Sequence, residues 1–407
     1  MSRPKNPVRV LYSFPNKLGA ARICYSAWQQ VNGLAAAGAD VTVFAGGVIR
    51  PVPVGVKVHT TLARGRLRIP YRLIGSRRAL RLHDYLVSRQ LESMRDDIDI
   101  IHTWPQGALW TLRAARKLGI PTVLERCNAH TRYSYEVVQK ECERLGVTLP
   151  PGHESAFSER VLGIEEEEFR QADRLLCPSE FVVKTFLDRG FKPESLARHI
   201  YGFDEKTYYP ETREHTPKRG LKMLFVGLCA VRKGVHYALE AWLRSSACQE
   251  GTFTIAGDFL PSYAEKLAPM RSHPSVHALG HRNDVPELMR QSDVLVLPSL
   301  EEGFGLVCTE AMGSGCVPLV SDACTDVCKH MENALVHHVG DVEALSQHIT
   351  LMDQNRELLS RLRSNGLGIL NQLTWDAAGI KLLDAYRETI EMYQHRPEFE
   401  AAALARV

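Results

Sequence analysis

The segment from Leu300 to Asp322 contains the residues whose types and spacing best suit catalysis. Glu302 and Glu310 are separated by seven residues, and Gly303 and Gly305 break the chain between them. Glycines let the backbone approach a ligand closely, and a helix start offers unpaired N–H groups to an anion. Two carboxylates beside such a helix start suit a ligand that carries phosphate at one point and hydroxyl groups at another. A nucleotide sugar has this chemistry.

A second segment has the features of a diphosphate site. Leu224–Gly227 is typical of a strand that ends in glycine, and Arg232, Lys233 and Gly234 follow it just before an apolar helical repeat. The turn and the helix start would supply N–H donors, and Lys233 would supply a point charge. The alternative is a surface lysine that merely precedes a helix. The glutamate motif in the same half of the chain favours the site.

Three further features carry weaker signals. Gly19 lies in a turn between the first strand and its helix, where it could contact phosphate or substrate. The run Glu165–Glu168 is interpreted as a solvated helix face. Cys324, Cys328 and His330 lack a second cysteine pair at ligand spacing, so no metal is expected there.

Short apolar strands alternate with helix-length segments along the whole chain, which predicts βαβ units and parallel sheets. The predicted strands are Val8–Ser13, Val41–Ala45, Ile98–His102, Thr122–Glu125, Arg174–Pro178, Lys222–Val226, Thr252–Ala256, Val276–Leu279, Val294–Leu297, Val317–Val320 and Leu335–His337. The polar stretch from Glu211 to Gly220 is the predicted linker. The fold class is therefore α/β, with two doubly wound, Rossmann-like domains facing a cleft and ligands at the carboxyl ends of the strands.

Composition excludes several classes of protein. The chain has 407 residues and a net charge of only +3, which gives no overall nucleic-acid-binding signature. It has no apolar run long enough to span a membrane, and the first strand begins too early to leave room for a signal peptide. The ten cysteines are scattered, mostly in apolar segments, as in a protein with reduced thiols. We therefore expect a cytoplasmic protein.

The sequence resembles the retaining glycosyltransferases of family four, which have the GT-B fold. The C-terminal half carries the resemblance through Phe225-Val226-Gly227, Arg232-Lys233-Gly234, Gly280 to Leu288, Ser292 to Ser299, Glu302-Gly303-Phe304-Gly305 and Glu310-Ala311-Met312. The N-terminal half matches more loosely, through the Gly19 loop, Pro178 to Phe181 and Tyr201 to Asp204. The resemblance implies an N-terminal acceptor-side domain over 1–208 and a nucleotide-sugar-binding domain over 209–385. It also implies that a last helix, at about 386–407, packs back on the first domain.

The resemblance also implies roles for individual residues. The diphosphate of the donor would lie on Lys233 and on backbone groups of the loop Gly303, Phe304, Gly305 and Leu306. Glu310 would bind the ribose, Glu302 would face the donor sugar, and the backbone from Ala278 to His281 would contact the base. The expected catalytic residues are His130, Lys233 and Glu302, and the expected donor-binding residues are Gly19, Gly227, Arg232, Lys233, Ala278, His281, Glu302, Gly303, Phe304, Gly305, Leu306 and Glu310.

Two positions depart from the family pattern. The family often has an arginine just after the strand-end glycine, where this chain has Leu228, and Arg232 is the residue that would compensate. The family's cleft histidine is expected near Cys127, but the nearest histidine is His130, three residues later. We choose His130 over a purely structural histidine, and Arg126 is its expected neighbour in the cleft.

The activity implied by the resemblance is transfer of a sugar from a nucleotide-diphosphate sugar to an acceptor hydroxyl, with retention of anomeric configuration (EC 2.4). No cofactor and no metal are expected. The acceptor would be a carbohydrate, a lipid-linked glycan or a small molecule, in glycan, glycolipid or polysaccharide biosynthesis. A sugar-nucleotide epimerase and a non-catalytic nucleotide-sugar-binding partner stay open as alternatives. A nicotinamide dehydrogenase fits poorly, because no Gly-x-Gly-x-x-Gly follows the first strand.

A basic segment lies in the N-terminal half. Seven arginines alternate with apolar residues between Arg64 and Arg81. Such a segment can lie on an anionic membrane or receive a lipid-diphosphate acceptor. The other interpretation is a surface helix whose arginines extend their charged ends into water. The expected location is therefore cytoplasmic, with peripheral contact at the inner face of the membrane as one of the two interpretations.

Overall fold

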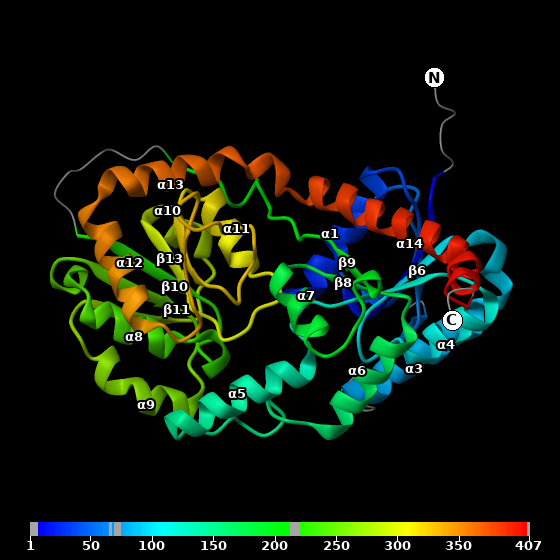
Figure 1. Ribbon diagram of the computed structural model, residues 1–407, viewed down its shortest axis with the longest axis horizontal. Coiled ribbons are helices and arrows are strands. Elements are labelled where there is room, and N and C mark those ends of the chain that lie inside the picture. Colours follow the sequence, from blue (N-terminus) through cyan, green and yellow to red (C-terminus); the bar gives the residue numbers. More distant parts are fainter. Residues whose placement is uncertain (1–6, 65–66, 69–74, 212–219, 405–407) are drawn as a thin grey trace.

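A computed structural model describes residues 7–64, 67–68, 75–211 and 220–404 of the chain. Two lobes lie side by side, each built around a parallel sheet with helices on its faces (Figure 1). In the N-lobe sheet the strand order is β3-β2-β1-β6-β7-β8-β9. These strands are β1 (Arg9–Leu18), β2 (Asp40–Val48), β3 (Lys57–Thr60), β6 (Ile100–Thr103), β7 (Thr122–Glu125), β8 (Arg174–Cys177) and β9 (Leu196–Arg198). A small hairpin pairs β4 (Ala63–Arg64) with β5 (Leu67–Arg68).

The C-lobe sheet has the order β12-β11-β10-β13-β14-β15. Its strands are β10 (Lys222–Val226), β11 (Thr252–Ala256), β12 (Val276–Gly280), β13 (Val294–Leu297), β14 (Val317–Ser321) and β15 (Leu335–His337). Every strand pair of the two sheets is parallel. The predicted fold class, two Rossmann-like α/β domains, is confirmed.

Helices connect the strands and cover the sheets. In the N-lobe they are α1 (Ile23–Ala36), α3 (Ser76–Gln90), α4 (Leu109–Leu118), α5 (Thr131–Leu145), α6 (Glu159–Gln171) and α7 (Glu180–Leu187). In the C-lobe they are α8 (Val235–Arg244), α9 (Pro261–Arg271), α10 (Val285–Gln291), α11 (Leu306–Gly313), α12 (Val342–Gln354) and α13 (Arg356–Gly368). The last helix is α14 (Trp375–Leu404).

Central strands are buried on both faces, as the apolar runs in the sequence predict. Every residue of β6, β7, β8 and β13 is buried, because helices cover both sides of each parallel sheet. By contrast, all four residues of β3, at the edge of the N-lobe sheet, are exposed. The buried apolar side chains form a separate main core for each lobe.

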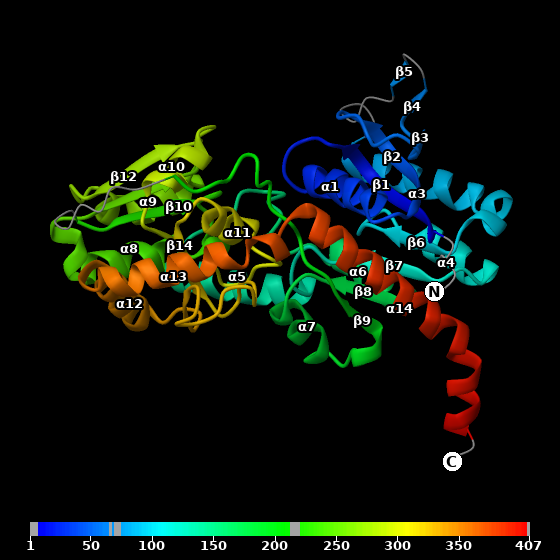
Figure 2. The same ribbon diagram turned by 90° about the horizontal axis from the view of Figure 1, so that it is seen from above.

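The last helix joins the lobes along one side of the molecule (Figures 1 and 2). Gly379 of α14 lies against Gly33 of α1 so closely that a Cβ on Gly379 would lie 2.3 Å from the Gly33 carbonyl carbon. Leu382, Leu383 and Tyr386 belong to the N-lobe core. Helix α14 thus contacts the N-lobe several residues before position 386, which is where the sequence predicts that contact to begin.

A second connection runs along the opposite side through α5 (Figure 1). The start of α5 belongs to the N-lobe, where the backbone N–H of His130 donates to Thr185 at 3.0 Å. Its far end packs into the C-lobe core through Cys142 and Leu145. Nothing in the apolar pattern of the sequence predicts that an N-lobe helix completes the core of the other lobe.

Two of the predicted segments lie largely outside the described residues. The structure does not describe residues 212–219 of the linker, nor 65–66 and 69–74 of the basic segment. The described arginines Arg77, Arg78 and Arg81 are exposed on α3. Among the described residues, no helix is both long and apolar enough to cross a bilayer.

Candidate active site

The strand–turn–helix of the predicted diphosphate site forms at the carboxyl edge of the C-lobe sheet. After β10, Gly227 adopts a φ of 140° and donates its N–H to Ala256 of the neighbouring strand at 3.0 Å. Gly234, with a φ of 65°, begins α8. A Cβ at Gly234 would lie 1.9 Å from the carbonyl oxygen of Pro298. Glycine is required there because the turn packs directly against the segment that follows β13.

The glutamate loop lies against this turn. The N–H of Leu300 donates to the carbonyl oxygen of Arg232 at 2.8 Å. Lys233 forms an ion pair and hydrogen bond with Glu302. The guanidinium Nη1 of Arg232 lies 3.7 Å from Glu302 and 3.4 Å from Glu301. The structure therefore brings Arg232, Lys233 and Glu302 together, although the loop and the turn are 69 residues apart in sequence.

These charges shift one another's protonation. Burial alone would raise the pKa of Glu302, but Lys233 and Arg232 outweigh it and hold that pKa below its usual value. Burial would lower the pKa of Arg232, but Glu302 and Glu301 outweigh it and raise that pKa. Glu302 and Arg232 thus each favour the charged form of the other.

Glu310 lies in α11, in an environment that favours its protonated form. Burial raises the pKa of Glu310 to about 7, a hydrogen bond with Tyr208 lowers it, and the charge of Asp204 raises it further. Asp204 also accepts from Tyr25 of the N-lobe at 3.4 Å. Helix α11 begins after Gly305, whose φ is 72° and which provides no side-chain cap. The first N–H groups of α11 are thus without a side-chain cap, as anion binding requires.

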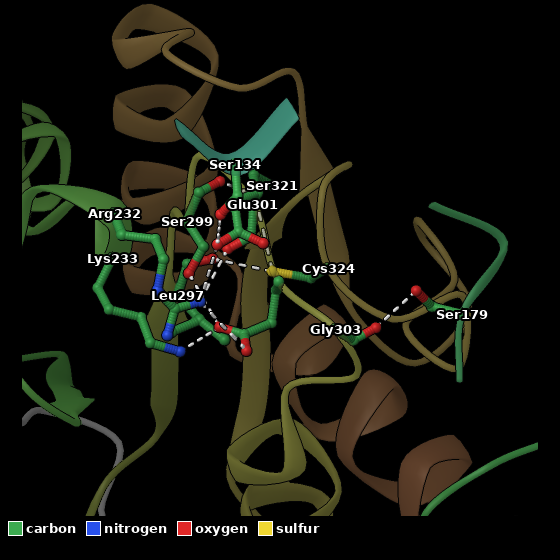
Figure 3. A network of polar contacts seen from close by, with 11 residues as sticks. Ser134, Ser179, Arg232, Lys233, Leu297, Ser299, Glu301, Gly303, Ser321 and Cys324 are labelled. Atoms are coloured by element: carbon green, nitrogen blue, oxygen red, sulfur yellow. Dashed lines mark hydrogen bonds and ion pairs between the residues drawn. The ribbon is translucent and has the colours of Figure 1, made fainter. Parts of the chain in front are cut away.

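The N-lobe closes over the glycine loop. Ser179, at the start of α7, donates its hydroxyl to the carbonyl oxygen of Gly303 at 2.6 Å. A Cβ on Gly303 would lie 1.6 Å from the carbonyl oxygen of Cys127, so only glycine fits there. The ring of Phe304 meets the ring of Tyr201 edge-on, with 5.7 Å between centroids. Figure 3 shows the contact between Ser179 and Gly303 beside the charged group.

The other predicted donor contacts lie on separate elements. Ala278 and His281 are exposed at the edge strand β12, and the backbone N–H of His281 donates to Asp258 at 3.0 Å. Gly19, with a φ of 81°, is held by Arg50, whose Nε donates to its carbonyl oxygen at 3.0 Å. Leu306 follows Gly305 as the first residue of α11.

His130 lies in a different environment from the charged group. Its ring is packed among Phe169, Phe186 and Phe191, with centroid distances of 5.3, 4.9 and 6.0 Å. Burial, helped by the charge of Arg126, lowers the pKa of His130 to about 3. Within the described residues, no contact joins this ring to Lys233 or Glu302. His130 instead caps α5 by accepting from the N–H of Arg132 at 3.2 Å.

His130 also borders a cavity of about 1280 Å³ in the N-lobe. Side chains of α6, of β8, of the segment after α7 and of α14 line it, among them Phe169, Arg174, Phe191 and Met392. Lys233 and Glu302 are not among the described residues that line this space. The cavity is therefore separate from the charged group.

The interpretation of Glu165–Glu168 as a solvated face was wrong for two of its members. Glu165 is buried and pairs with Arg126 at 3.2 Å. Glu168 is buried and accepts from the backbone N–H groups of Gln106 and Ala108 at 2.7 and 3.0 Å. Helical periodicity turns these two carboxylates inward, where the N-lobe offers donors. Arg126, expected in the cleft, is thus held inside the N-lobe.

Sequence reasoning also missed residues that complete the charged group. Glu301 precedes Glu302 in the motif, is buried, and touches Arg232. Ser134 of α5 donates to Glu301 at 2.7 Å from the other lobe. The position of Glu301 beside Glu302 was a usable signal, whereas nothing in the sequence around Ser134 indicates a contact 167 residues away.

Comparison with known sequences agrees with this geometry. The family described as Glycosyltransferase Family 4 matches residues 25–201, and the family described as Glycosyl transferases group 1 matches residues 220–355. The two matches together cover most of the chain. The chain belongs to the family-four glycosyltransferases. This family assignment confirms the resemblance predicted from the Lys233 turn and the Glu302 motif.

Curated relatives of this family-four chain match it over limited lengths. Glycogen synthase of Mycobacterium tuberculosis is 32% identical over 176 residues, which cover 41% of each chain. The lipopolysaccharide glucosyltransferase WaaG of Escherichia coli is 34% identical over 124 residues, 28% of this chain and 33% of WaaG. The chain thus spans less than half the length of these two relatives.

Solved structures extend the likeness of this family-four chain to nearly its whole length. Sucrose-phosphate synthase from Thermosynechococcus elongatus has a TM-score of 0.66 at 19% identity, covering 94% of this chain and 99% of the other. Anabaena HepE in complex with UDP-glucose has a TM-score of 0.62 at 18% identity, with the same coverage. At these identities the likeness shows the two-lobed fold alone.

Proposed function

We propose that this chain transfers a sugar from a nucleotide-diphosphate sugar to an acceptor hydroxyl with retention of anomeric configuration. The observation that carries the proposal is the contact between Lys233 and Glu302 beside the start of α11. A cation for phosphate, a carboxylate for sugar hydroxyls and a helix start for anionic oxygens lie together. A sugar diphosphate needs these three groups at one place.

In the proposed reaction the bond between the sugar and the nucleoside diphosphate breaks while the acceptor hydroxyl attacks from the same face. Negative charge then grows on the departing phosphate, where Lys233 and Arg232 stabilise it. A departing phosphate oxygen accepts the proton of the acceptor, so the step needs no separate protein base. Because the two cations supply the positive charge, we propose that the reaction requires no metal ion or cofactor.

Glu310 is proposed to bind the ribose. An ionised carboxylate accepts hydrogen bonds from both hydroxyls of a ribose, whereas a protonated one accepts less well. With a pKa of about 7, Glu310 lies at the boundary between the two states near neutral pH. Hydrogen bonds from the ribose favour the ionised form, so donor binding lowers this pKa.

Similar proteins support a nucleotide-sugar donor and a glycan or lipid-linked acceptor. HepE was solved with UDP-glucose. Two curated relatives are a galactosyltransferase acting on a sugar-diphosphoundecaprenol in Escherichia coli and an N-acetylgalactosaminyltransferase acting on one in Campylobacter jejuni. We propose the same donor and acceptor classes for this chain.

Peripheral contact with an anionic membrane is proposed for the N-lobe. The support comes from the exposed arginines Arg77, Arg78 and Arg81, all on α3. Sedimentation with anionic and with neutral vesicles tests this contact. Equal recovery of the protein with both kinds of vesicle would contradict it.

Two alternatives make different chemical predictions. A sugar-nucleotide epimerase would convert one nucleotide sugar into another without an acceptor. A non-catalytic partner would bind nucleotide sugars and never turn them over, and Leu228 at the usual arginine position gives this alternative some support. Product analysis by mass spectrometry separates both from a transferase.

The first experiment is a screen of the purified chain against nucleotide sugars without an acceptor, following slow nucleotide release. Release from one donor, absent in Lys233→Ala, is the expected result and names the donor. The matched control is Lys222→Ala, at the start of β10, which keeps the same strand but lies away from the loop. Equal release by Lys233→Ala and wild type would contradict the proposed site.

A further inference from the structure

Arg232, which is partly exposed, pairs with the buried Glu301 through one nitrogen of its guanidinium. Nη1 of Arg232 donates to the carbonyl oxygen of Glu301 at 3.2 Å and lies 3.4 Å from its carboxylate. Within the described residues, Nε and Nη2 of Arg232 make no hydrogen bond. Glu301 thus binds Nη1 of the guanidinium, and Nε and Nη2 stay available to an anion.

Glu301 is itself held from the other lobe. Its Oε1 accepts from the hydroxyl of Ser134 at 2.7 Å, and the side chain is only 1% exposed. Its Oε2 is buried and has no hydrogen-bond partner among the described residues. Figure 3 shows Ser134 entering from α5 and Arg232 and Lys233 pointing toward the same carboxylates. A buried carboxylate anchored in this way is not readily displaced by an incoming diphosphate.

The helix that supplies Ser134 also contacts the next element after the phosphate turn. Glu141, two turns further along α5, pairs with His236 in the first turn of α8 at 2.8 Å. His236 in turn contacts the hydroxyl of Tyr263 at 2.6 Å. Helix α5 is therefore linked to the segment Ala230–His236 directly at His236 and, through Glu301, at Arg232. The position of this segment thus depends on the position of α5 against the C-lobe.

We propose that Glu301 is a positioning residue that, anchored by Ser134 of the opposite lobe, aims Arg232 at the diphosphate of the donor. The pair takes the place of the phosphate-binding arginine that is missing at Leu228. Donor binding in the C-lobe is thereby coupled to the position of the N-lobe helix α5. This inference rests on the proposed function, because it assigns Arg232 to the leaving diphosphate.

A purely neutralising role for Glu301 predicts the opposite change in diphosphate affinity. If Glu301 only neutralised Arg232, removing its charge would make the site more positive and would tighten diphosphate binding. In the proposed arrangement its loss lets Arg232 turn toward Glu302, only 3.7 Å from Nη1. Arg232 would then compete with Lys233 for that carboxylate and leave the ligand. Binding therefore weakens.

The test is a double-mutant cycle on binding of UDP, GDP and ADP, measured by calorimetry with the full chain. We expect Glu301→Gln to weaken binding of the preferred nucleotide about tenfold, and to have less than about twofold effect in an Arg232→Ala background. Ser134→Ala removes one hydrogen bond to the Glu301 carboxylate and should weaken binding about threefold, while Ser134→Thr keeps the hydroxyl and stays near wild type. Ser88→Ala, on α3, and the exposed Glu332→Gln are the matched controls.

Kinetics provide a second reading where a donor turns over. Because Arg232 contacts the diphosphate before and during transfer, Glu301→Gln should raise the donor KM more than it lowers kcat. Tighter nucleotide binding by Glu301→Gln, or an equal effect with and without Arg232, would overturn the inference. A wild type that binds a nucleotide but never transfers would overturn the proposed function while leaving the binding cycle valid. Melting temperatures of all variants exclude a general loss of fold.

Discussion

Two charged groups among the described residues, one in each lobe, differ in how far their side chains are exposed to solvent. In the N-lobe, Glu125 is fully buried and accepts from Gln30 at 2.9 Å and from Tyr201 at 2.7 Å. His199 lies 2.9 Å from the same carboxylate, and His102 lies 3.5 Å away. In the C-lobe, Arg232 and Lys233 keep part of their surface exposed and share two carboxylates.

The N-lobe group is completed by the protein itself. The elements β7, α1, β6 and α14 all contribute, since Tyr386 of α14 contacts His102 at 2.5 Å. The side chains of Glu125, His102 and His199 are all fully buried, so this network stabilises the fold and is out of reach of a ligand. In the C-lobe group, the cations Arg232 and Lys233 are partly exposed and lie beside a glycine loop and a helix start. Buried charge alone therefore does not identify a site, whereas partly exposed cations beside a helix start do.

The largest expected effect is on stability, in the N-lobe group. Glu125→Ala leaves His199 and Tyr201 without their acceptor, and we expect it to lower the free energy of unfolding by about 3–5 kcal/mol. Urea denaturation measures this loss. Activity per folded molecule should change little, in contrast to the C-lobe. A variant as stable as wild type would show that the fold does not depend on the N-lobe group.

The same group predicts acid sensitivity. Burial lowers the pKa of His102 to about 3, so its neutral form stabilises the fold above the usual histidine pKa and this contribution is lost as the pH falls through 3. Burial would raise the pKa of Glu125, but His199 outweighs it and the pKa falls to about 2. Both shifts make stability decline on acidification, most of all between about pH 6 and 3. Glu125→Gln, which removes the carboxylate, should flatten the unfolding free energy below about pH 4.5, whereas the contribution of His102 remains.

The next largest effect is on turnover, in the C-lobe group. Lys233→Ala removes the cation nearest Glu302, and we expect turnover to fall about a hundredfold, or about 3 kcal/mol in the barrier. The melting temperature should stay close to that of wild type, because the side chain lies at an open edge of the group. If Lys233→Ala lost stability but kept its specific activity, the C-lobe group would have a structural role instead of a catalytic one.

The parts of the fold that sequence reasoning predicted are those set by local pattern. All eleven predicted strands form, because apolar runs bounded by polar turns specify parallel strands wherever they occur. In the two parallel sheets, the unpredicted strands β3 and β9 are short edge strands, and the four residues of β3 are exposed, so no apolar run marks it. Edge strands gain their pairing from the neighbouring strand more than from their own sequence.

For the candidate site, local motifs indicated the Lys233 turn and the Glu302 loop but not the residues that surround them. The Lys233 turn and the Glu302 loop contact each other as their separate patterns indicated. The roles of the contact residues stay predictions. The contact of Ser134 with Glu301, and the docking of α5 on the C-lobe core, depend on the placement of the lobes. A contact between distant segments leaves no periodicity in either one.

The pKa of Glu310 offers a subtler contrast between the lobes. Unlike Glu125, Glu310 has a pKa raised by burial to about 7, so its protonated form stabilises the fold and that contribution declines as the pH rises from 4.5 through 7. If the ionised carboxylate binds ribose, nucleotide affinity should rise as the pH increases from 6 to 8, by about tenfold at most. Calorimetric titration with UDP, GDP and ADP at several pH values measures it. Glu310→Gln should bind more weakly and lose the pH dependence, and an unchanged profile in that variant would assign the titration to another group.

The smallest expected effect tests whether the C-lobe group has been rebuilt around Arg232. Leu228 is 38% exposed and directly follows Gly227, so an arginine fits there without disturbing the core. Leu228→Arg should restore nucleotide binding to Arg232→Ala by about three- to tenfold, because a charge-assisted contact is regained. Leu228→Gln in the same background is the matched control without the charge, and it should restore nothing. Equal rescue by both would mean that the group needs a polar side chain at this position and not a second cation. The Arg232–Glu301 pair would then not be a replacement for a phosphate-binding arginine.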